Sequence, residues 1–265
     1  MPLGPHACVA GAPSRDRSIP RFTFLTFHFF MHRPLYAIPL LSVAVLTGGG
    51  LSACRGGGLT AAALRPDGLE LRDGDLLFQL SECGSAITDV TTGIDALPVE
   101  HVGIYLATDC DGRQREAAVA PPCVLEAIPE GGVTLTPLDA FLARHVSADD
   151  LPLVLVGRVT QPDFDVALSL EGALRYLGTP YDSLFMPDDR AIYCSELVQK
   201  SYVTRLGREV FAAVPMTFRD ATGEILPHWE EFYTRLGLVV PEGEPGSNPG
   251  ELSRRENVEI VARMF

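Results

Sequence analysis

The chain has 265 residues, and 46% of them are apolar, which is enough material for one ordinary globular core. Its 34 acidic residues outnumber its 21 basic residues, so the formal net charge is −13. This balance argues against a nucleic-acid partner, because two negatively charged surfaces repel each other. We expect a monomer with no such partner.

Residues 31–53 have the pattern of a signal peptide. Met31-His32-Arg33 supplies a short basic region, and an apolar run extends from Leu35 to Leu46. The run is too short to span a membrane permanently. Its ending, Leu51-Ser52-Ala53-Cys54, resembles the bacterial lipobox. That resemblance implies cleavage before Cys54 and lipid attachment to its thiol. An ordinary secretory signal with an incidental Cys54 is the alternative.

The residue after the expected cleavage site bears on location. Arg55 stands where an Asp retains many lipoproteins in the inner membrane of enteric bacteria. We therefore predict an exported protein that is lipid-anchored in the bacterial envelope, at the outer membrane and facing the periplasm. A second acyl chain on the new amino terminus would make this membrane anchor stable.

These features divide the chain into four parts. Residues 1–30 fit neither a signal nor a domain, and we interpret them as a start-site artefact upstream of Met31. The signal peptide is 31–53, and 54–68 hold the lipidated cysteine and a tether rich in Gly and Ala. Residues 69–265 show no internal repeat and no second hydrophobic span, so we expect one soluble domain there.

Apolar runs bounded by turn residues predict the strands of this domain. The expected ranges are Asp75–Leu80, Val102–Ala107, Cys123–Ile128, Val133–Leu135 and Leu153–Val159. A last short element is expected at Val258–Val261. The Pro and Gly residues of Pro241–Gly250 predict a loop.

Capping residues and helical spacing predict two helices before the last third of the chain. One is expected to start at Thr136, a cap followed by Pro137 at the first helical position. The other has Asp163 as its expected cap and apolar residues at helical spacing as far as Leu177. Gly178 is expected to end it.

Three histidines lie beyond the signal peptide, and their contexts differ. His101 opens an apolar run, where a strand would hold a general base rigidly. His145 follows Arg144 near the end of an expected helix, and His228 lies in an expected loop beside Trp229. Both are more typical of a surface or an interface. His101 is therefore the candidate base, although a histidine at a strand edge is more often structural.

Cys194 lies where a loop is expected to become a third helix, which ends at Gly207. The positive end of a helix dipole stabilises a thiolate, and a neighbouring imidazolium would stabilise it further. The alternative is an inert core cysteine. One side of this helix is expected to carry Leu197, Val198, Tyr202 and Leu206.

The surroundings of Cys194 resemble a known family. The run Leu177-Gly178-Thr179-Pro180-Tyr181, then Tyr193-Cys194-Ser195-Glu196-Leu197-Val198-Gln199, is similar to the nucleophile region of NlpC-type cell-wall peptidases. In the ordinary family the Cys precedes the His, whereas here His101 comes first.

The order of the parts points to one branch of that superfamily. Together with Gly74-Asp75-Leu76-Leu77-Phe78-Gln79 and His101-Val102-Gly103-Ile104, it resembles the YiiX-like, circularly permuted branch of the papain superfamily. The resemblance covers roughly residues 69–202 and, more faintly, the tail. It implies an α+β, permuted papain-like (NlpC-like) fold, with an antiparallel sheet or small barrel packed against helices.

The same resemblance implies a role for each site residue. Cys194 would attack a carbonyl carbon, and His101 would accept its proton and later return one to the leaving group. Glu126, on the strand expected to pair with that of His101, would orient the imidazole. Tyr181 would help the backbone N–H of Cys194 to stabilise the oxyanion, and Ser195 is a further oxyanion or substrate contact. A surface Glu126 and a core-edge Tyr181 are the alternatives.

The other cysteines fit an oxidising compartment. Cys110 lies in an expected turn and Cys123 on the returning strand, so a disulfide between them is a candidate that sequence alone cannot fix. Cys83 has no obvious partner. The chain has no paired Cys-x-x-Cys and no His-Glu-x-x-His, so we predict no metal site and no cofactor.

Location and resemblance together predict a cysteine amidase or peptidase. Its leading substrate is an amide bond in a peptidoglycan stem peptide or a related amino-acyl conjugate. A lipid acyltransferase or phospholipase-like thiol enzyme is a rival, because the lecithin-retinol acyltransferase group also places His before Cys. Ser195-Glu196 departs from the Glu-His usual in that group. A third hypothesis is a non-catalytic binding lipoprotein.

Overall fold

The computed structural model describes residues 68–82, 84–108 and 122–265, and all of them belong to one compact unit. None of the helices in these ranges is both long and apolar enough to cross a bilayer. The expected signal peptide and Cys54 lie outside the described residues, as do Cys83 and Cys110.

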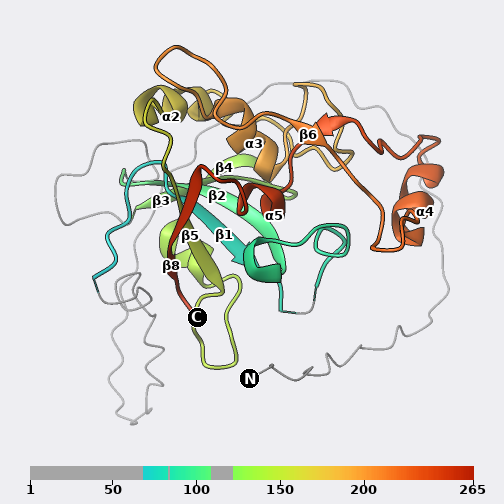
Figure 1. Cartoon of the computed structure of the whole chain (residues 1–265), viewed down its shortest axis with the longest axis horizontal. Coiled ribbons are helices and arrows are strands. Elements are labelled where there is room, and N and C mark those ends of the chain that lie inside the picture. The colour runs from blue at the N-terminus through green and yellow to red at the C-terminus, as the bar shows by residue number, and fades with distance from the viewer. Residues whose placement is uncertain (1–67, 83, 109–121) are drawn as a thin grey trace, which may run out of the picture. The chain divides into compact units, whose positions relative to one another are not determined.

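Six strands form one antiparallel sheet in the order β4-β3-β2-β1-β5-β8 (Figure 1). Their bounds are β1 Leu76–Leu80, β2 Val99–Leu106, β3 Cys123–Ile128, β4 Gly132–Pro137, β5 Val154–Val159 and β8 Val258–Arg263. Within the described residues β4 and β8 are the two edges and do not pair with each other. The fold is therefore α+β with an open sheet, and of the two expected forms the small barrel is not the one observed.

The central strand β1 is buried on both faces of the sheet, and four of its five residues are apolar, with Gln79 as the exception. All five residues of β1 are buried. Since successive side chains of a strand point to opposite faces, Leu76 and Phe78 join one apolar cluster and Leu77 joins another.

Helices cover the two faces unequally. The cluster that contains Phe78 also contains residues of α2 (Val166–Leu174), α3 (Cys194–Ser201) and α5 (Pro249–Leu252). The cluster that contains Leu77 includes the buried side chains of α1 (Leu138–Leu142). The helix that begins with Cys194 therefore packs directly on the sheet.

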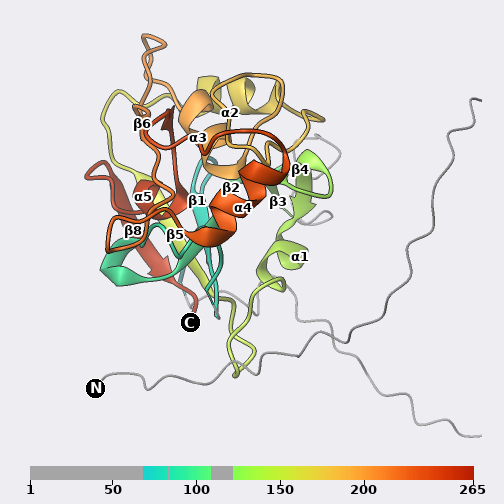
Figure 2. The same cartoon turned by 90° about the vertical axis from the view of Figure 1, so that its right-hand side faces the viewer.

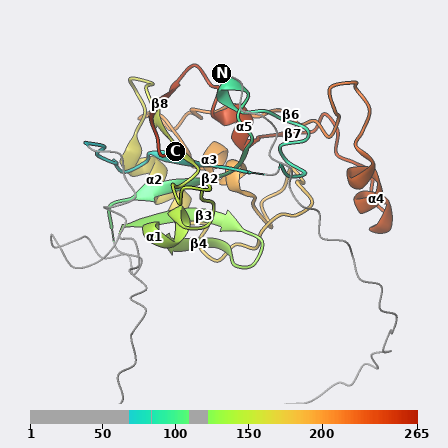
Figure 3. The same ribbon diagram turned by 90° about the horizontal axis from the view of Figure 1, so that it is seen from below.

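A smaller apolar cluster lies beside the sheet and includes residues of α4 (Pro227–Arg235). Figure 2 shows the molecule with α4 toward the viewer. Phe218, Trp229 and Tyr233 are its buried residues. In Figure 3 α4 stands beyond the two-stranded pair β6 (Val214–Pro215) and β7 (Pro245–Gly246). A short 3-10 turn, η1 (Ile94–Ala96), completes the elements of the described residues.

The helix that begins at Cys194 is shorter than predicted. It ends at Ser201 rather than Gly207, because Tyr202 turns to an extended conformation with ψ 113°. The Tyr202 hydroxyl donates to the Gly74 carbonyl at 3.0 Å, which fixes the ring in the core. Leu206, expected on the same apolar side, is 77% exposed.

Both predicted amino-terminal caps are wrong. Asp165, not Asp163, caps α2 by accepting from the Leu168 N–H, while Asp163 accepts from the side chain of Gln161. Helix α1 begins at Leu138, and Thr136 belongs to β4, where its hydroxyl has another partner.

Two elements were predicted as loops. His228 lies in α4, which begins with Pro227 at its first position. The stretch Pro241–Gly250 contains β7 and the start of α5, whose cap Asn248 accepts from the Gly250 N–H. Proline and glycine serve here as helix starts and tight turns, and composition alone did not distinguish these uses from a loop.

Candidate active site

Cys194 is the first residue of α3, and Tyr193 before it has extended backbone angles. The Tyr193 N–H donates to Glu196 at 3.4 Å, and Glu196 pairs with Lys200 at 2.7 Å, so the first turn is held from within the helix. The Cys194 side chain is buried. The first N–H groups of a helix lack intrahelical acceptors and carry a partial positive charge, which favours a thiolate and an oxyanion here.

His101 lies inside β2 rather than at its start, because the strand begins at Val99, three residues before the predicted start at Val102. It pairs with Gln79 of β1 across the sheet. Its Nε2 donates to Glu126 Oε2 at 2.6 Å. This leaves Nδ1 for Cys194, whose side chain is also a hydrogen-bond partner of the imidazole.

Glu126 of β3 is fully buried, and each of its carboxylate oxygens accepts hydrogen bonds from neighbouring side chains. Arg144 binds it with two parallel bonds, Nη1 to Oε2 at 2.8 Å and Nη2 to Oε1 at 2.6 Å. The Thr136 hydroxyl of β4 donates to Oε1 at 2.5 Å. A buried carboxylate is costly unless paired in this way, so the arrangement keeps Glu126 ionised and fixed beside the imidazole.

The pKa values of this pair follow from the contacts. Burial lowers the pKa of His101, but the Cys194 thiolate and then Glu126 outweigh it and raise the pKa to about 9. Burial raises the pKa of Glu126, but hydrogen bonds from Arg144 and then His101 bring it to about 2. Between these two values a charged His101 imidazolium lies beside an ionised Glu126 carboxylate.

Tyr181 lies beside the nucleophile because its backbone bridges Ile192, two residues before Cys194. Burial, followed by the charge of Cys194, raises the pKa of the Tyr181 hydroxyl, which therefore stays protonated and can donate. Ser195 is fully buried, and its hydroxyl has no hydrogen-bond partner among the described residues. Its predicted part in substrate contact stays a prediction.

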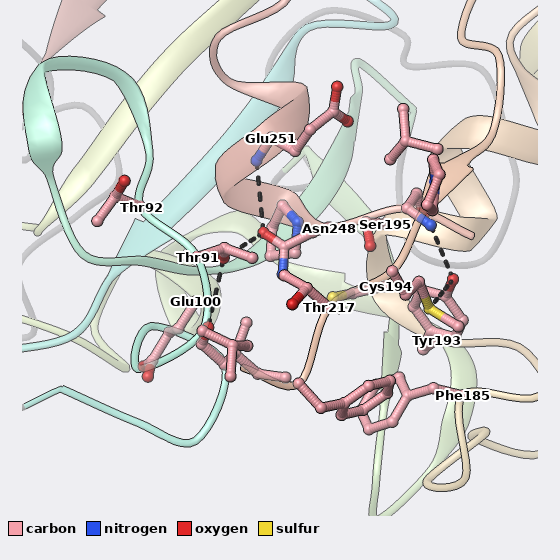
Figure 4. Close-up of a pocket in the computed structure, with 18 of the residues that line it drawn as sticks. Thr91, Thr92, Glu100, Phe185, Tyr193, Cys194, Ser195, Thr217, Asn248 and Glu251 are labelled. Atoms are coloured by element: carbon pink, nitrogen blue, oxygen red, sulfur yellow. Dashed lines mark hydrogen bonds between the residues drawn. The ribbon is translucent and has the colours of Figure 1, made fainter. Parts of the chain in front are cut away.

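A cavity of about 380 Å³ opens beside Cys194 (Figure 4). Apolar side chains dominate its lining, and the charged residues that reach it are Glu100, Glu251 and Arg254. Its volume is at the lower end of the range for small-molecule sites. A substrate group of modest size can therefore lie against the thiol.

The remaining predicted residues have partners other than Cys194, His101 and Glu126. His145 faces Glu100 at 3.4 Å, and His228 packs beside Trp229 with ring centroids 5.1 Å apart. Cys123 takes part in a disulfide bond, but Cys110 is outside the described residues, so their pairing stays a prediction.

Sequence reasoning missed three residues that hold the site together. Arg144 and Thr136 bind Glu126, as described above. Gln79 donates to the Phe141 carbonyl at 2.8 Å and accepts from Arg144 at 3.4 Å. Gln79 ends a motif that the sequence had singled out, but nothing near Arg144 in sequence signals that it reaches a buried carboxylate.

A helix-start cysteine, a strand histidine and a buried carboxylate on an antiparallel sheet define a papain-like cysteine hydrolase centre. The sequence pattern of the family described as "Permuted papain-like amidase enzyme, YaeF/YiiX, C92 family" matches residues 70–262. The chain belongs to this family.

Two relatives carry the same likeness. The "Uncharacterized protein YiiX" of Escherichia coli strain K12 is 31% identical over 145 residues, which cover 52% of this chain and 60% of that protein. The match thus spans less than two thirds of that relative. The crystal structure of "metalloprotein yiiX" from Escherichia coli O157:H7 has a TM-score of 0.54 at 26% identity, covering 72% of this chain and 97% of that one.

The description as a metalloprotein refers to the Escherichia coli O157:H7 protein. Within residues 68–82, 84–108 and 122–265 of this chain, no group of three or more His, Cys, Asp or Glu side chains is arranged to hold a metal ion. His101 and Glu126 already bind each other, and the Arg144 guanidinium forms an ion pair with the Glu126 carboxylate. These residues do not fit a metal site.

Proposed function

We propose that this protein is a cysteine hydrolase of the bacterial envelope that cleaves an amide bond, with a peptidoglycan stem peptide or a related amino-acyl conjugate as substrate. The observation that carries the proposal is the chain of contacts from Cys194 through His101 to Glu126 and Arg144, beside a cavity. Membership of an amidase family supports the same reaction type.

The first half of the reaction forms an acyl-enzyme. The Cys194 thiolate attacks the carbonyl carbon, a C–S bond forms, and the carbonyl oxygen takes the negative charge. The backbone N–H of Cys194 and the Tyr181 hydroxyl would donate to that oxygen. When the intermediate collapses the C–N bond breaks, and the imidazolium of His101 gives its proton to the leaving amine.

The second half returns the enzyme to its starting state. A water molecule attacks the thioester, and His101, now neutral, accepts the proton of that water. The C–S bond breaks, releasing a carboxylic acid and the Cys194 thiolate. Glu126 keeps one ring nitrogen protonated throughout, so the other always faces the sulfur.

A lipid acyltransferase or phospholipase-like activity is the second candidate, and the apolar lining of the cavity favours it. Both are tested by incubating the full chain in mild detergent with purified peptidoglycan fragments and, separately, with phospholipid micelles. Amide products that are absent with Cys194→Ala are the expected result. Deacylated lipid would transfer the protein to the second class, and no product from either would leave a binding lipoprotein.

We further propose that the protein is anchored at the outer membrane, facing the periplasm, through lipid on Cys54. The lipobox-like sequence before Cys54 supports this. Cells that express the chain with radiolabelled palmitate should yield a labelled protein, whereas Cys54→Ala should yield none. Equal labelling of both would rule out this anchor.

A further inference from the structure

Phe185 has a backbone conformation that its residue type disfavours. Its φ is +49°, in the left-handed region, where a bulky side chain is an outlier. Such conformations persist only where the surrounding structure enforces them, and they gather at functional sites.

Hydrogen bonds fix the backbone on both sides of Phe185. The Asp182 carboxylate accepts from the Leu184 N–H at 2.8 Å and from the Met186 N–H at 2.6 Å. The Tyr233 hydroxyl of α4 donates to the Leu184 carbonyl at 2.9 Å. The loop is thus built to keep this residue in place.

The conformation brings the Phe185 ring to the cavity beside the nucleophile. The ring lies edge-on to Tyr193, which precedes Cys194, with centroids 5.2 Å apart. It also lies edge-on to Trp229 of α4, at 5.7 Å. Phe185 therefore fills the space between the start of α3 and α4, and all three rings line the cavity.

The two ends of the cavity differ in chemistry. In Figure 4 Phe185 is drawn on the same side as Cys194 and Tyr193, whereas Glu100 lies on the opposite side of the group. The side chains drawn beside the thiol are aromatic rings together with hydroxyl groups such as that of Ser195, and none of the labelled ones is charged. A charged group placed there would lose its hydration without a partner, while an apolar group would gain from burial.

We propose that Phe185 determines specificity by forming, with Trp229, the wall of a subsite for a compact, uncharged apolar group, branched or aromatic, next to the scissile bond. This inference rests on the proposed amide hydrolysis. The volume of about 380 Å³ limits the group to roughly the size of an amino-acid side chain with its neighbouring atoms.

The test uses the full chain with amino-acyl 4-nitroanilides that differ only in side chain: Gly, Ala, Leu and Phe. The wild type should cleave the Leu and Phe compounds with kcat/KM at least about tenfold above the Gly compound. Phe185→Ala should reduce that ratio about tenfold, because kcat/KM falls more for the Leu and Phe compounds than for the Gly compound. Phe232→Ala is the matched control, because Phe232 belongs to the same aromatic cluster but does not line the cavity, and it should keep the ratio.

A second variant separates folding from specificity. Phe185→Gly suits the positive φ, so it should melt at or above the temperature of Phe185→Ala while losing the same preference. A ratio unchanged by both variants would overturn the inference and leave the hydrolase proposal intact.

A binding measurement distinguishes failure of the subsite proposal from failure of the hydrolase proposal. Calorimetry with Cys194→Ala should show tighter binding of the Leu and Phe compounds than of the Gly compound. Such binding without turnover by the wild type would support the subsite and overturn the hydrolysis. Equal binding of the whole series would overturn the subsite.

Discussion

Arg144 is the residue on which the ionised state of Glu126 most depends. Because its two bonds hold the pKa of Glu126 at about 2, Arg144→Met should raise that pKa. The acid limb of the kcat/KM profile should move to higher pH, and the maximum should fall by about tenfold or more, since a misoriented base transfers protons poorly. The measurement is kcat/KM against pH with an amide substrate.

Two further variants show whether this effect comes from positioning. Arg144→Lys keeps the charge but loses the parallel pair of bonds. Its maximal kcat/KM and the position of its acid limb should therefore lie between those of Arg144→Met and the wild type. Arg175→Met removes an exposed ion pair with Glu171 and should leave both kcat/KM and the acid limb unchanged. An acid limb that stays in place in Arg144→Met would contradict this role.

His101 sets the alkaline limit of activity. The group is charged below its pKa of about 9, and only the charged form can protonate a leaving amine. The kcat/KM value should therefore fall as pH rises through about 9. In Glu126→Gln the alkaline limb should move to lower pH, because Glu126 is one of the groups that raise this pKa. Activity that increases up to pH 10 would be inconsistent with this assignment.

At the scale of elements, Gly132 joins the β3–β4 hairpin to the loop before Tyr181. The Thr179 carbonyl accepts from the Val133 N–H at 2.9 Å, and a Cβ on Gly132 would lie 2.1 Å from that carbonyl oxygen. The φ of Gly132 is also positive, at +65°. Gly132→Ala should lower the free energy of unfolding by at least about 2 kcal/mol and reduce kcat/KM by displacing the Tyr181 hydroxyl.

Gly223→Ala provides the comparison for this variant. Gly223 has φ +88° but open space around it, so only the backbone cost of about 1 kcal/mol applies and activity should stay unchanged. Urea unfolding and kcat/KM measure the two effects. Equal losses in both variants would show that the close approach at Thr179 is unimportant.

The strands were predictable from sequence, and several helices were not. The range Cys123–Ile128 was predicted as observed, because a buried apolar run bounded by turns has few other uses. Helix α4 begins at a proline and has only a short apolar side, Trp229 and Tyr233, which packs on a separate cluster. Helix α3 stops early because the Tyr202 hydroxyl reaches Gly74, a long-range contact that local spacing does not report.

Some residues of the site could likewise be predicted from sequence, and others could not. Cys194, His101, Glu126 and Tyr181 were named from motifs, and the structure brings them together. Arg144 was noted only as the neighbour of His145, because its partner Glu126 lies on another strand. Phe185 carries no motif, and only its backbone angle and ring contacts single it out. Residues that act on one another through packing are the ones that sequence alone left unassigned.

For the whole molecule, the reactive centre exists only when distant segments meet. Cys194 comes from α3, His101 and Glu126 from the middle of the sheet, and Arg144 from the segment after α1. Because His101 precedes Cys194 in the chain, as expected for the permuted family, no local stretch contains the pair. We therefore expect the reactivity of the thiol to depend on the folded chain.

The rate at which iodoacetamide alkylates Cys194 at neutral pH, followed by peptide mass spectrometry, reports whether His101 activates the thiol. The wild type should react at least about tenfold faster than His101→Gln, and unfolding in urea should remove the difference, because only a thiolate held by the imidazolium reacts quickly. Equal rates for the folded wild type and His101→Gln would contradict the account, since Cys194 would then be an ordinary buried thiol.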